Sequence, residues 1–164
     1  PPTSSEGESM ATWSEFQEAA PEIAQRGEKQ LFQFGPGLAF LSTVRKDGGP
    51  RLHPVCVNLV DSQLALLIVP SPNQRDLLRD DRFVLHSFPG PKSDDDFYLS
   101  GRAIRIADPV ALERFEAAQP AGGATTSGDE AGSTLDIERA LYSKYKPHGE
   151  SDNWPPTYLK WHSD

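Results

Sequence analysis

From residue 38 onward the chain is built from short apolar runs separated by turn-forming residues, and this spacing restricts its fold most strongly. The first three runs, at 38–44, 51–60 and 64–69, are joined by connections of only a few residues. The first connection contains DGGP at 47–50, which suits a tight turn because Asp-Gly tolerates the positive φ of hairpins. Parallel strands would need crossovers of about a dozen residues or more. The segment therefore predicts an antiparallel meander of three strands.

The rest of the chain extends this pattern. Further strands are predicted at 83–88 and 97–106, and the alternation of apolar residues at 135–142 favours a sixth. About six strands with few, short helices indicate a small barrel. Residues 119–133 are Gly, Ala, Thr and Ser without an apolar pattern, so we expect a mobile loop there.

Helix starts are marked by capping residues. Thr12 and Glu15 form a T-x-x-E capping box, and Pro21 should break or restart the helix that follows. Ser71-Pro72 and Asp108-Pro109 each combine a capping residue with a proline at the first helical position. These pairs predict a short helix after Ser71, with Gln74 completing its capping box, and another helix that ends near Ala118. In the first of them, we expect Leu77 and Leu78 to face inward.

The N-terminal residues 1–9 (PPTSSEGES) are polar and lack periodicity, whereas Met10 directly precedes a helix start. We interpret 1–9 as a tail that precedes the native initiator, and 10–164 as one domain.

Charge and composition exclude several classes of function. The chain carries 24 acidic and 16 basic residues, a net charge of −8, so nucleic acid is a poor partner. No run approaches the ~18 apolar residues of a membrane span, and no secretory signal is visible, which predicts a cytoplasmic protein without membrane contact. The lone Cys56 lies in an apolar run and reads as a small buried hydrophobe. The four histidines are scattered, so we expect no metal site.

Catalytic residues cannot be assigned, because the chain has no G-x-S-x-G, H-E-x-x-H or P-loop motif. The acidic run 94–96 reads as solvated surface. The junction at 69–77 is more informative, since a capped helix start attracts anions and Arg75 and Arg79 add charge to it. His53 before Pro54 belongs at a sheet edge or beside a ligand, since proline cannot donate to a strand ladder.

Three segments in this order, LAFLSTVRKDGGPRLHPV (38–55), SPNQRDLLRDDRFVLHS (71–87) and FYLSGRAIRI (97–106), resemble the FMN-binding split-barrel family typified by pyridoxamine 5′-phosphate oxidase. The resemblance implies a mainly β protein with a six-stranded antiparallel split β-barrel and flanking helices. It also implies a homodimer that holds two flavin cofactors at the subunit interface.

The same resemblance suggests the cofactor site. In the family, the second strand lies against the isoalloxazine ring and an S-x-K-x-x-x-L element grips the phosphate. Asn73 stands where that element has lysine, so phosphate affinity would depend more on Arg75, His53 or the partner subunit. Trp161 is the candidate that would cap the ring across the interface. The predicted cofactor-binding residues are His53, Pro54, Val55, Val69, Ser71, Asn73, Arg75 and Trp161.

The function that follows from the resemblance is an oxidoreductase that uses FMN, or a deazaflavin coenzyme, on a small organic substrate. Vitamin B6 phosphate is disfavoured, because no arginine follows Arg139 in the C-terminal segment. Two alternatives remain open: a non-enzymatic barrel that binds flavin or haem, and a small hydrolase whose triad leaves no motif.

Overall fold

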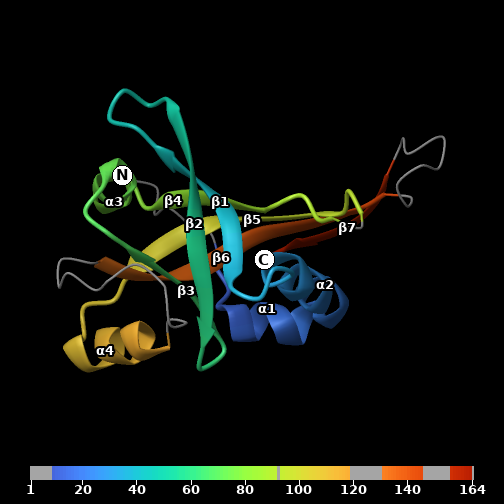
Figure 1. Cartoon of the computed structure of the whole chain (residues 1–164), viewed down its shortest axis with the longest axis horizontal. Coiled ribbons are helices and arrows are strands. Elements are labelled where there is room, and N and C mark those ends of the chain that lie inside the picture. The colour runs from blue at the N-terminus through green and yellow to red at the C-terminus, as the bar shows by residue number, and fades with distance from the viewer. Residues whose placement is uncertain (1–8, 92, 119–130, 146–155, 164) are drawn as a thin grey trace, which may run out of the picture.

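The computed structural model describes residues 9–91, 93–118, 131–145 and 156–163. Four helices and seven strands lie within them (Figure 1). In chain order they are α1 (Trp13–Ala19), α2 (Pro21–Leu31), β1 (Gly37–Val44), β2 (Pro50–Val60), β3 (Gln63–Ile68), α3 (Pro72–Arg79), β4 (Arg82–Ser87), β5 (Asp96–Arg105), α4 (Pro109–Ala117), β6 (Ala131–Lys144) and β7 (Thr157–His162).

The strands form an antiparallel sheet in the order β3-β2-β1-β4-β5-β6-β7, and a further pairing of β3 with β6 closes it. Six strands therefore make a closed barrel, and β7 continues the sheet beyond β6. The prediction of a mainly β, six-stranded antiparallel barrel is confirmed. The seventh strand lies in the aromatic C-terminal segment and was not predicted.

Strand β6 joins the barrel to the rest of the sheet because it has neighbours along both edges. One edge pairs with β5, and the other pairs first with β3 over 131–134 and later with β7 over 139–144. Between these two partners, Ala11 forms an isolated bridge with Ile137. The described residues of β6 thus anchor both the N-terminal and the C-terminal segments.

Alternating apolar residues fill the barrel. Every second residue of β1 is buried, and the same holds for most of β5. Helix α1 adds two large rings to this core: Trp13 and Phe16 are almost fully buried, and Trp13 meets Phe97 edge-on with ring centroids 6.5 Å apart. Complete burial of such side chains contributes on the order of 2–3 kcal/mol each. Helices α1 and α2 lie together along one side of the sheet (Figure 1).

Most local predictions are confirmed. The capping box is present, with the Glu15 N–H donating to Thr12 Oγ1 at 3.2 Å and the Thr12 N–H donating to Glu15 Oε1 at 3.2 Å. Pro21 begins a new helix after α1, as expected. In the β1–β2 turn, Gly48 has φ +86°, a conformation that a side chain would strain.

Several expectations are wrong. Cys56 is exposed, because side chains alternate along β2 and this one lies on the face opposite Val55 and Val57, which turn toward the core. Leu78 is 55% exposed, because α3 turns Asn73 and Asp76 inward instead. Of the predicted loop 119–133, residues 131–133 belong to β6, and the remainder lies outside the described residues, as does most of the predicted tail at 1–9.

The acidic run also differs from the expectation of a solvated surface. Asp95 is half-buried and accepts hydrogen bonds from Tyr142 Oη at 2.6 Å and from the Tyr145 N–H at 2.9 Å. Burial, together with the neighbouring Asp95, raises the pKa of Tyr142 to about 12. Asp95 therefore ties the start of β5 to the end of β6.

Candidate functional site

The start of α3 is held by an N-cap and by a hydrogen bond to the end of β3. Ser71 is the N-cap, and its Oγ accepts the Gln74 N–H at 3.3 Å. The Gln74 amide donates in turn to the Ile68 carbonyl at 3.1 Å. Pro72 has no backbone N–H, and the backbone N–H of Gln74 already donates to Ser71. Attraction of an anion to this helix start would therefore depend more on side-chain charge than on free backbone donors. Val69 lies just before this cap and is 42% exposed.

A buried carboxylate joins α3 to the first two strands. Asp76 is 2% exposed, and its Oδ2 accepts from Arg51 Nε at 2.6 Å and from Thr43 Oγ1 at 2.8 Å. Its Oδ1 accepts from Arg79 Nη2 at 2.9 Å. Burial opposes ionisation, but the hydrogen bonds from Arg51, Thr43 and Arg79 outweigh it and lower the pKa of Asp76 to about 2. Arg51 and Arg79 therefore share this one buried carboxylate.

The remaining arginine of α3 is in a different state. Arg75 is exposed, and no ion pair or hydrogen bond of its side chain is found among the described residues. Asn73 is 3% exposed, and its Nδ2 has no hydrogen-bond partner in the described part of the chain. Buried polar groups are rarely left unpaired. The first turn of α3 thus carries one uncompensated positive charge and one unsatisfied donor.

The predicted ring-binding strand has an open edge beside this helix. β1 pairs with β2 over 50–57, whereas β3 pairs with it only over 57–60. Residues 50–56 therefore have a strand neighbour on one side only, which agrees with the edge position expected for His53 and Pro54. Both are exposed. Arg51 lies on this edge and donates a hydrogen bond to Asp76 on α3. The open edge of β2 and helix α3 therefore meet at one corner of the molecule.

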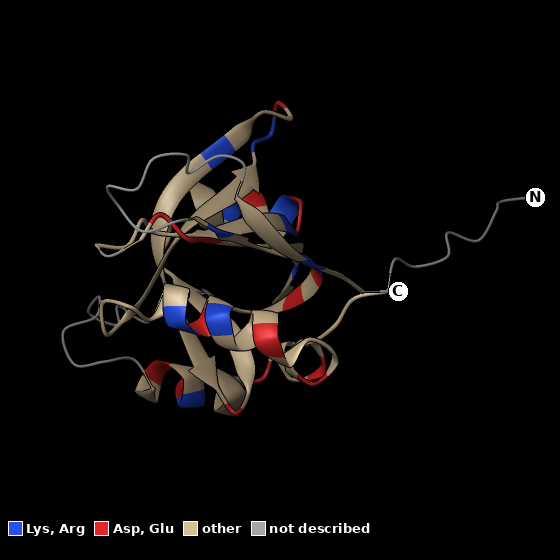
Figure 2. Cartoon of the chain, turned by 90° about the vertical axis from the view of Figure 1, so that its right-hand side faces the viewer, with Lys and Arg blue, Asp and Glu red and all other residues tan. Residues whose placement is uncertain are grey.

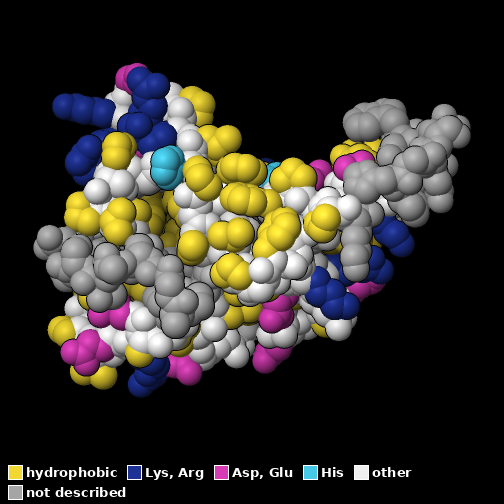
Figure 3. All heavy atoms as spheres, in the orientation of Figure 1, with side chains coloured by type: hydrophobic (Ala, Val, Ile, Leu, Met, Phe, Trp, Pro, Cys, Tyr) yellow, Lys and Arg dark blue, Asp and Glu magenta, His cyan; other side chains and the backbone are white. Residues whose placement is uncertain are grey.

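Side chains along this edge alternate between two faces. His53 and Val55 share the face of Arg51, whereas Pro54 lies opposite Phe40 on the other face of the sheet. One planar ring cannot contact the His53 and Pro54 side chains from a single face. Lys and Arg side chains gather at the end of the molecule where the β1–β2 hairpin and α3 lie, as Figure 3 shows.

Trp161 lies elsewhere in the chain. It is on β7, half-buried, and its ring packs on that of Phe16 with centroids 4.9 Å apart. The strand that carries His53 and the helix that carries Asn73 and Arg75 are therefore joined through Arg51 and Asp76, whereas Trp161 lies on the strand at the other end of the sheet order.

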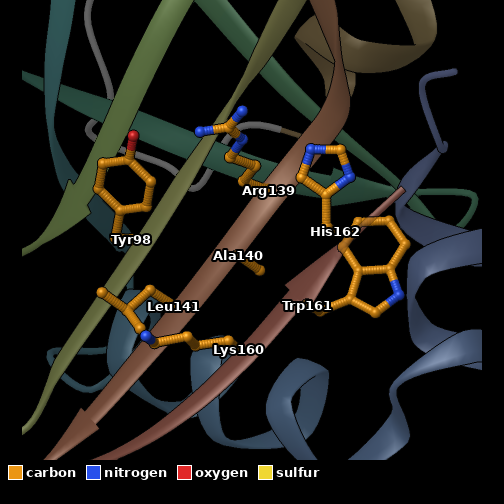
Figure 4. Close-up of a pocket in the computed structure, with 7 residues that line it drawn as sticks. All are labelled: Tyr98, Arg139, Ala140, Leu141, Lys160, Trp161 and His162. Atoms are coloured by element: carbon orange, nitrogen blue, oxygen red, sulfur yellow. The ribbon is translucent and has the colours of Figure 1, made fainter. Parts of the chain in front are cut away.

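Trp161 borders a second feature, a groove of about 480 Å³ over β5, β6 and β7 (Figure 4). Tyr98, Leu141 and Lys160 are cross-strand partners and share the open face of the sheet here, whereas Ala140 and Trp161 pair with each other and turn toward the core. Its basic residues are Arg139, Lys160 and His162.

Two of the basic residues of the groove lie near one carboxylate. Arg139 Nε is 3.6 Å from Glu138 Oε1, and His162 Nε2 is 3.9 Å from the same oxygen. The Lys160 ammonium lies 5.7 Å from the centre of the Tyr158 ring. The sequence did not predict this groove, because the groove forms only when β6 pairs with a seventh strand. The only available signal was the alternation of polar and aromatic residues at 157–162.

Elsewhere the charges are mixed. On the side of the molecule shown in Figure 2, acidic and basic residues are interspersed rather than gathered in one basic patch. Within the described residues, no cluster of three or more His, Cys, Asp or Glu side chains could hold a metal ion. None of the described helices has the length and apolarity needed to cross a membrane.

Comparison with solved structures finds several proteins that share this fold. A haem-binding protein from Mycobacterium smegmatis matches with a TM-score of 0.60 and 18% identity, over 83% of this chain and 57% of its own. A Clostridium acetobutylicum protein of the pyridoxinephosphate oxidase family, related to general stress protein 26 of B. subtilis, matches with 0.57 and 12%, over 90% and 94%. An F420 reductase matches with 0.50 and 14%, over 63% and 87%.

These similarities show a common fold, which is the one that the sequence resemblance implies. The chain spans little more than half the length of the haem-binding protein. No model of a known protein family matches the sequence, and no curated protein does.

Proposed function

We propose that this protein is a flavin-dependent oxidoreductase of the pyridoxamine 5′-phosphate oxidase-like family, acting on a small organic substrate. The observation that carries the proposal is the corner where the open edge of β2 meets α3. There an uncompensated Arg75 and an exposed His53 lie on adjoining elements joined by the Arg51–Asp76 bond. FMN is the first choice of cofactor, and a deazaflavin coenzyme is the alternative. One structural neighbour of the chain is an F420 reductase.

The residues at this corner fit an anionic aromatic cofactor in part. Arg75 offers a full charge, and Asn73 offers an amide that lacks an acceptor. His53 and the exposed backbone edge of β2 would lie along the ring. The bound flavin supplies the hydride chemistry itself, so the protein needs to bind, orient and shield it rather than provide an acid or base. The absence of a catalytic sequence motif is consistent with this division of labour.

We also propose that two copies pair through the sheet face that carries Phe40. Pro54, Phe40, His86 and Tyr98 lie directly opposite one another on β2, β1, β4 and β5, so they share this face. Phe40 stacks on Phe88 with centroids 4.4 Å apart, and Figure 3 shows hydrophobic side chains gathered over the middle of the molecule. Light scattering after size exclusion should then give twice the 18.0 kDa of one chain.

The cofactor proposal is tested by Arg75→Ala. FMN titration followed by flavin fluorescence should show affinity reduced by about tenfold or more, since one charge-assisted contact is lost. The thermal midpoint without cofactor should hardly change, because Arg75 is exposed. Arg114→Ala on α4 is the matched control, and it should leave FMN affinity intact. Equal FMN affinity in wild type and Arg75→Ala would refute this assignment.

A non-enzymatic haem-binding role is the second candidate, and one observation favours it. His53 is an exposed imidazole at the same corner, and a structural neighbour of the chain is a haem-binding protein. The absorption spectrum after haemin addition separates the two. A Soret shift that disappears in His53→Ala would favour haem over flavin.

A further inference from the structure

We infer that the hollow between the C-terminal ends of α2 and α4 is a binding site for a small organic cation, a protonated primary amine that carries an apolar group. This α2–α4 hollow has a volume of about 520 Å³, which is within the range of small-molecule sites. The inference goes beyond the proposed flavin site, because the hollow uses none of the residues at the corner of α3.

The walls of the hollow come from helix ends and from one strand edge. Glu28 and Phe32 line it from α2, and the Phe32 N–H donates to the Glu28 carbonyl at 3.0 Å, so helical spacing puts both side chains on the same side. β1 begins at Gly37, opposite Val57, and residues 58 and 59 of β2 therefore offer an open edge to the hollow. Ala118, the C-cap of α4, completes the lining.

The electrostatics of this lining favour a cation. Glu28 is half-buried, and its carboxylate has no ion pair or hydrogen bond among the described residues. Two helices end here, and the C-terminal end of a helix carries a partial negative charge. Arg114, in the last turn of α4, is paired with Asp61 at 2.9 Å. Within the described part of the chain no basic residue lines the hollow, and Lys29 borders a neighbouring one along α2.

The rest of the lining is apolar. Phe32 is half-buried, and Pro36 and Leu59 border the same space. The position of the ring depends on Gly37, because a methyl group at residue 37 would come within 2.8 Å of Phe32 Cε1. An aromatic ring attracts a cation and also packs against its apolar part. A primary ammonium adds three hydrogen-bond donors for a carboxylate and for helix-end carbonyls.

The hollow is separate from the two features proposed above. Gly27 of α2 lies against the ring of Phe97, which points to the opposite face of β5 from Tyr98. Helix α2 therefore covers the face of the sheet that is turned away from the proposed pairing of two copies. Along β2, Asn58 is roughly 23 Å from Arg51, which marks the flavin corner.

The experiment is calorimetric titration of the full chain at pH 7 with 2-phenylethylamine and with its uncharged analogue, 2-phenylethanol. The amine should bind about tenfold more tightly than the alcohol, or better. Glu28→Gln should remove most of that preference and leave the alcohol affinity unchanged. Glu18→Gln loses the same charge from an exposed position on α1 and should behave as wild type. Phe32→Leu removes the ring and should weaken both ligands several-fold.

Three results would overturn the inference. One is equal affinity for amine and alcohol, or no detectable binding of the amine. Another is a preference for the amine that survives in Glu28→Gln or falls equally in Glu18→Gln, which would mean a general attraction of cations to an acidic chain. The third is unchanged affinity for both ligands in Phe32→Leu, which would place them outside the hollow. Failure of FMN to bind wild type would count against the flavin proposal alone.

Discussion

The two basic regions of this molecule differ in how their charges are balanced. Under α3, Asp76 is buried and accepts bonds from Arg51, Arg79 and Thr43 at 2.6–2.9 Å. In the groove over β5–β7, Arg139 has its nearest acid at 3.6 Å and is well exposed. A charge that is matched within the chain stabilises the fold, whereas a charge left unmatched beside an apolar surface is available to a ligand.

The same contrast exists on α3 itself. Arg79 binds Asp76 and the Val44 carbonyl, at 2.9 Å and 2.7 Å, and so fastens the helix to the sheet. Arg75, four residues earlier, has no such partner among the described residues. The two arginines of one helix therefore have different roles, and mutations should separate stability from binding.

The largest effect is expected for Asp76→Ala. Removing one member of a buried ion pair leaves Arg51 partly uncompensated and should cost about 3–5 kcal/mol of unfolding free energy. Urea denaturation measures this loss. Asp47→Ala is the control, because its pair with Arg45 is exposed and should contribute less than about 1 kcal/mol. Similar losses in the two variants would contradict the larger contribution expected of the buried carboxylate.

Low pH should weaken the hydrogen bonds that Asp76 accepts from Arg51, Thr43 and Arg79. The pKa of Asp76 is about 2 in the folded chain against an ordinary value of 3.8, so the unfolded state takes up its proton first. The stabilisation is therefore complete above pH 4 and is lost as the pH falls toward 2, a loss of roughly 2 kcal/mol.

Urea midpoints of wild type and Asp76→Asn at pH 5 and pH 2.5 give the measurement. The difference in urea midpoint between wild type and Asp76→Asn should be smaller at pH 2.5 than at pH 5. An equal difference at both pH values would mean that folding does not lower the pKa of Asp76.

Sequence reasoning succeeded where local chemistry determines structure. The Asp-Gly turn at 47–48, the Thr12 and Ser71 caps and the restart at Pro21 depend on neighbouring residues, so their physics can be read along the chain. The closed barrel followed from short connections and from the family resemblance. His53 before Pro54 indicated an edge, because proline is poorly tolerated inside a sheet.

Sequence reasoning failed where long-range pairing decides. β7 is recruited by the free edge of β6, which no local pattern reveals. Leu78 was assigned inward from hydrophobicity, but the bonds of Asp76 set the orientation of α3 and leave Leu78 exposed. Cys56 is exposed because it lies on the face of β2 that points away from the core. The groove was missed for the same reason as β7.

The smallest effect should come from the groove variant Arg139→Gln/Lys160→Gln. Neither cation has a close ion pair in the described part of the chain, so the unfolding free energy should stay within about 0.5 kcal/mol of wild type. Urea denaturation again provides the measurement, with Arg105→Gln/Lys144→Gln as the charge-matched control. A loss of several kcal/mol specific to the groove variant would show that these cations hold the sheet together.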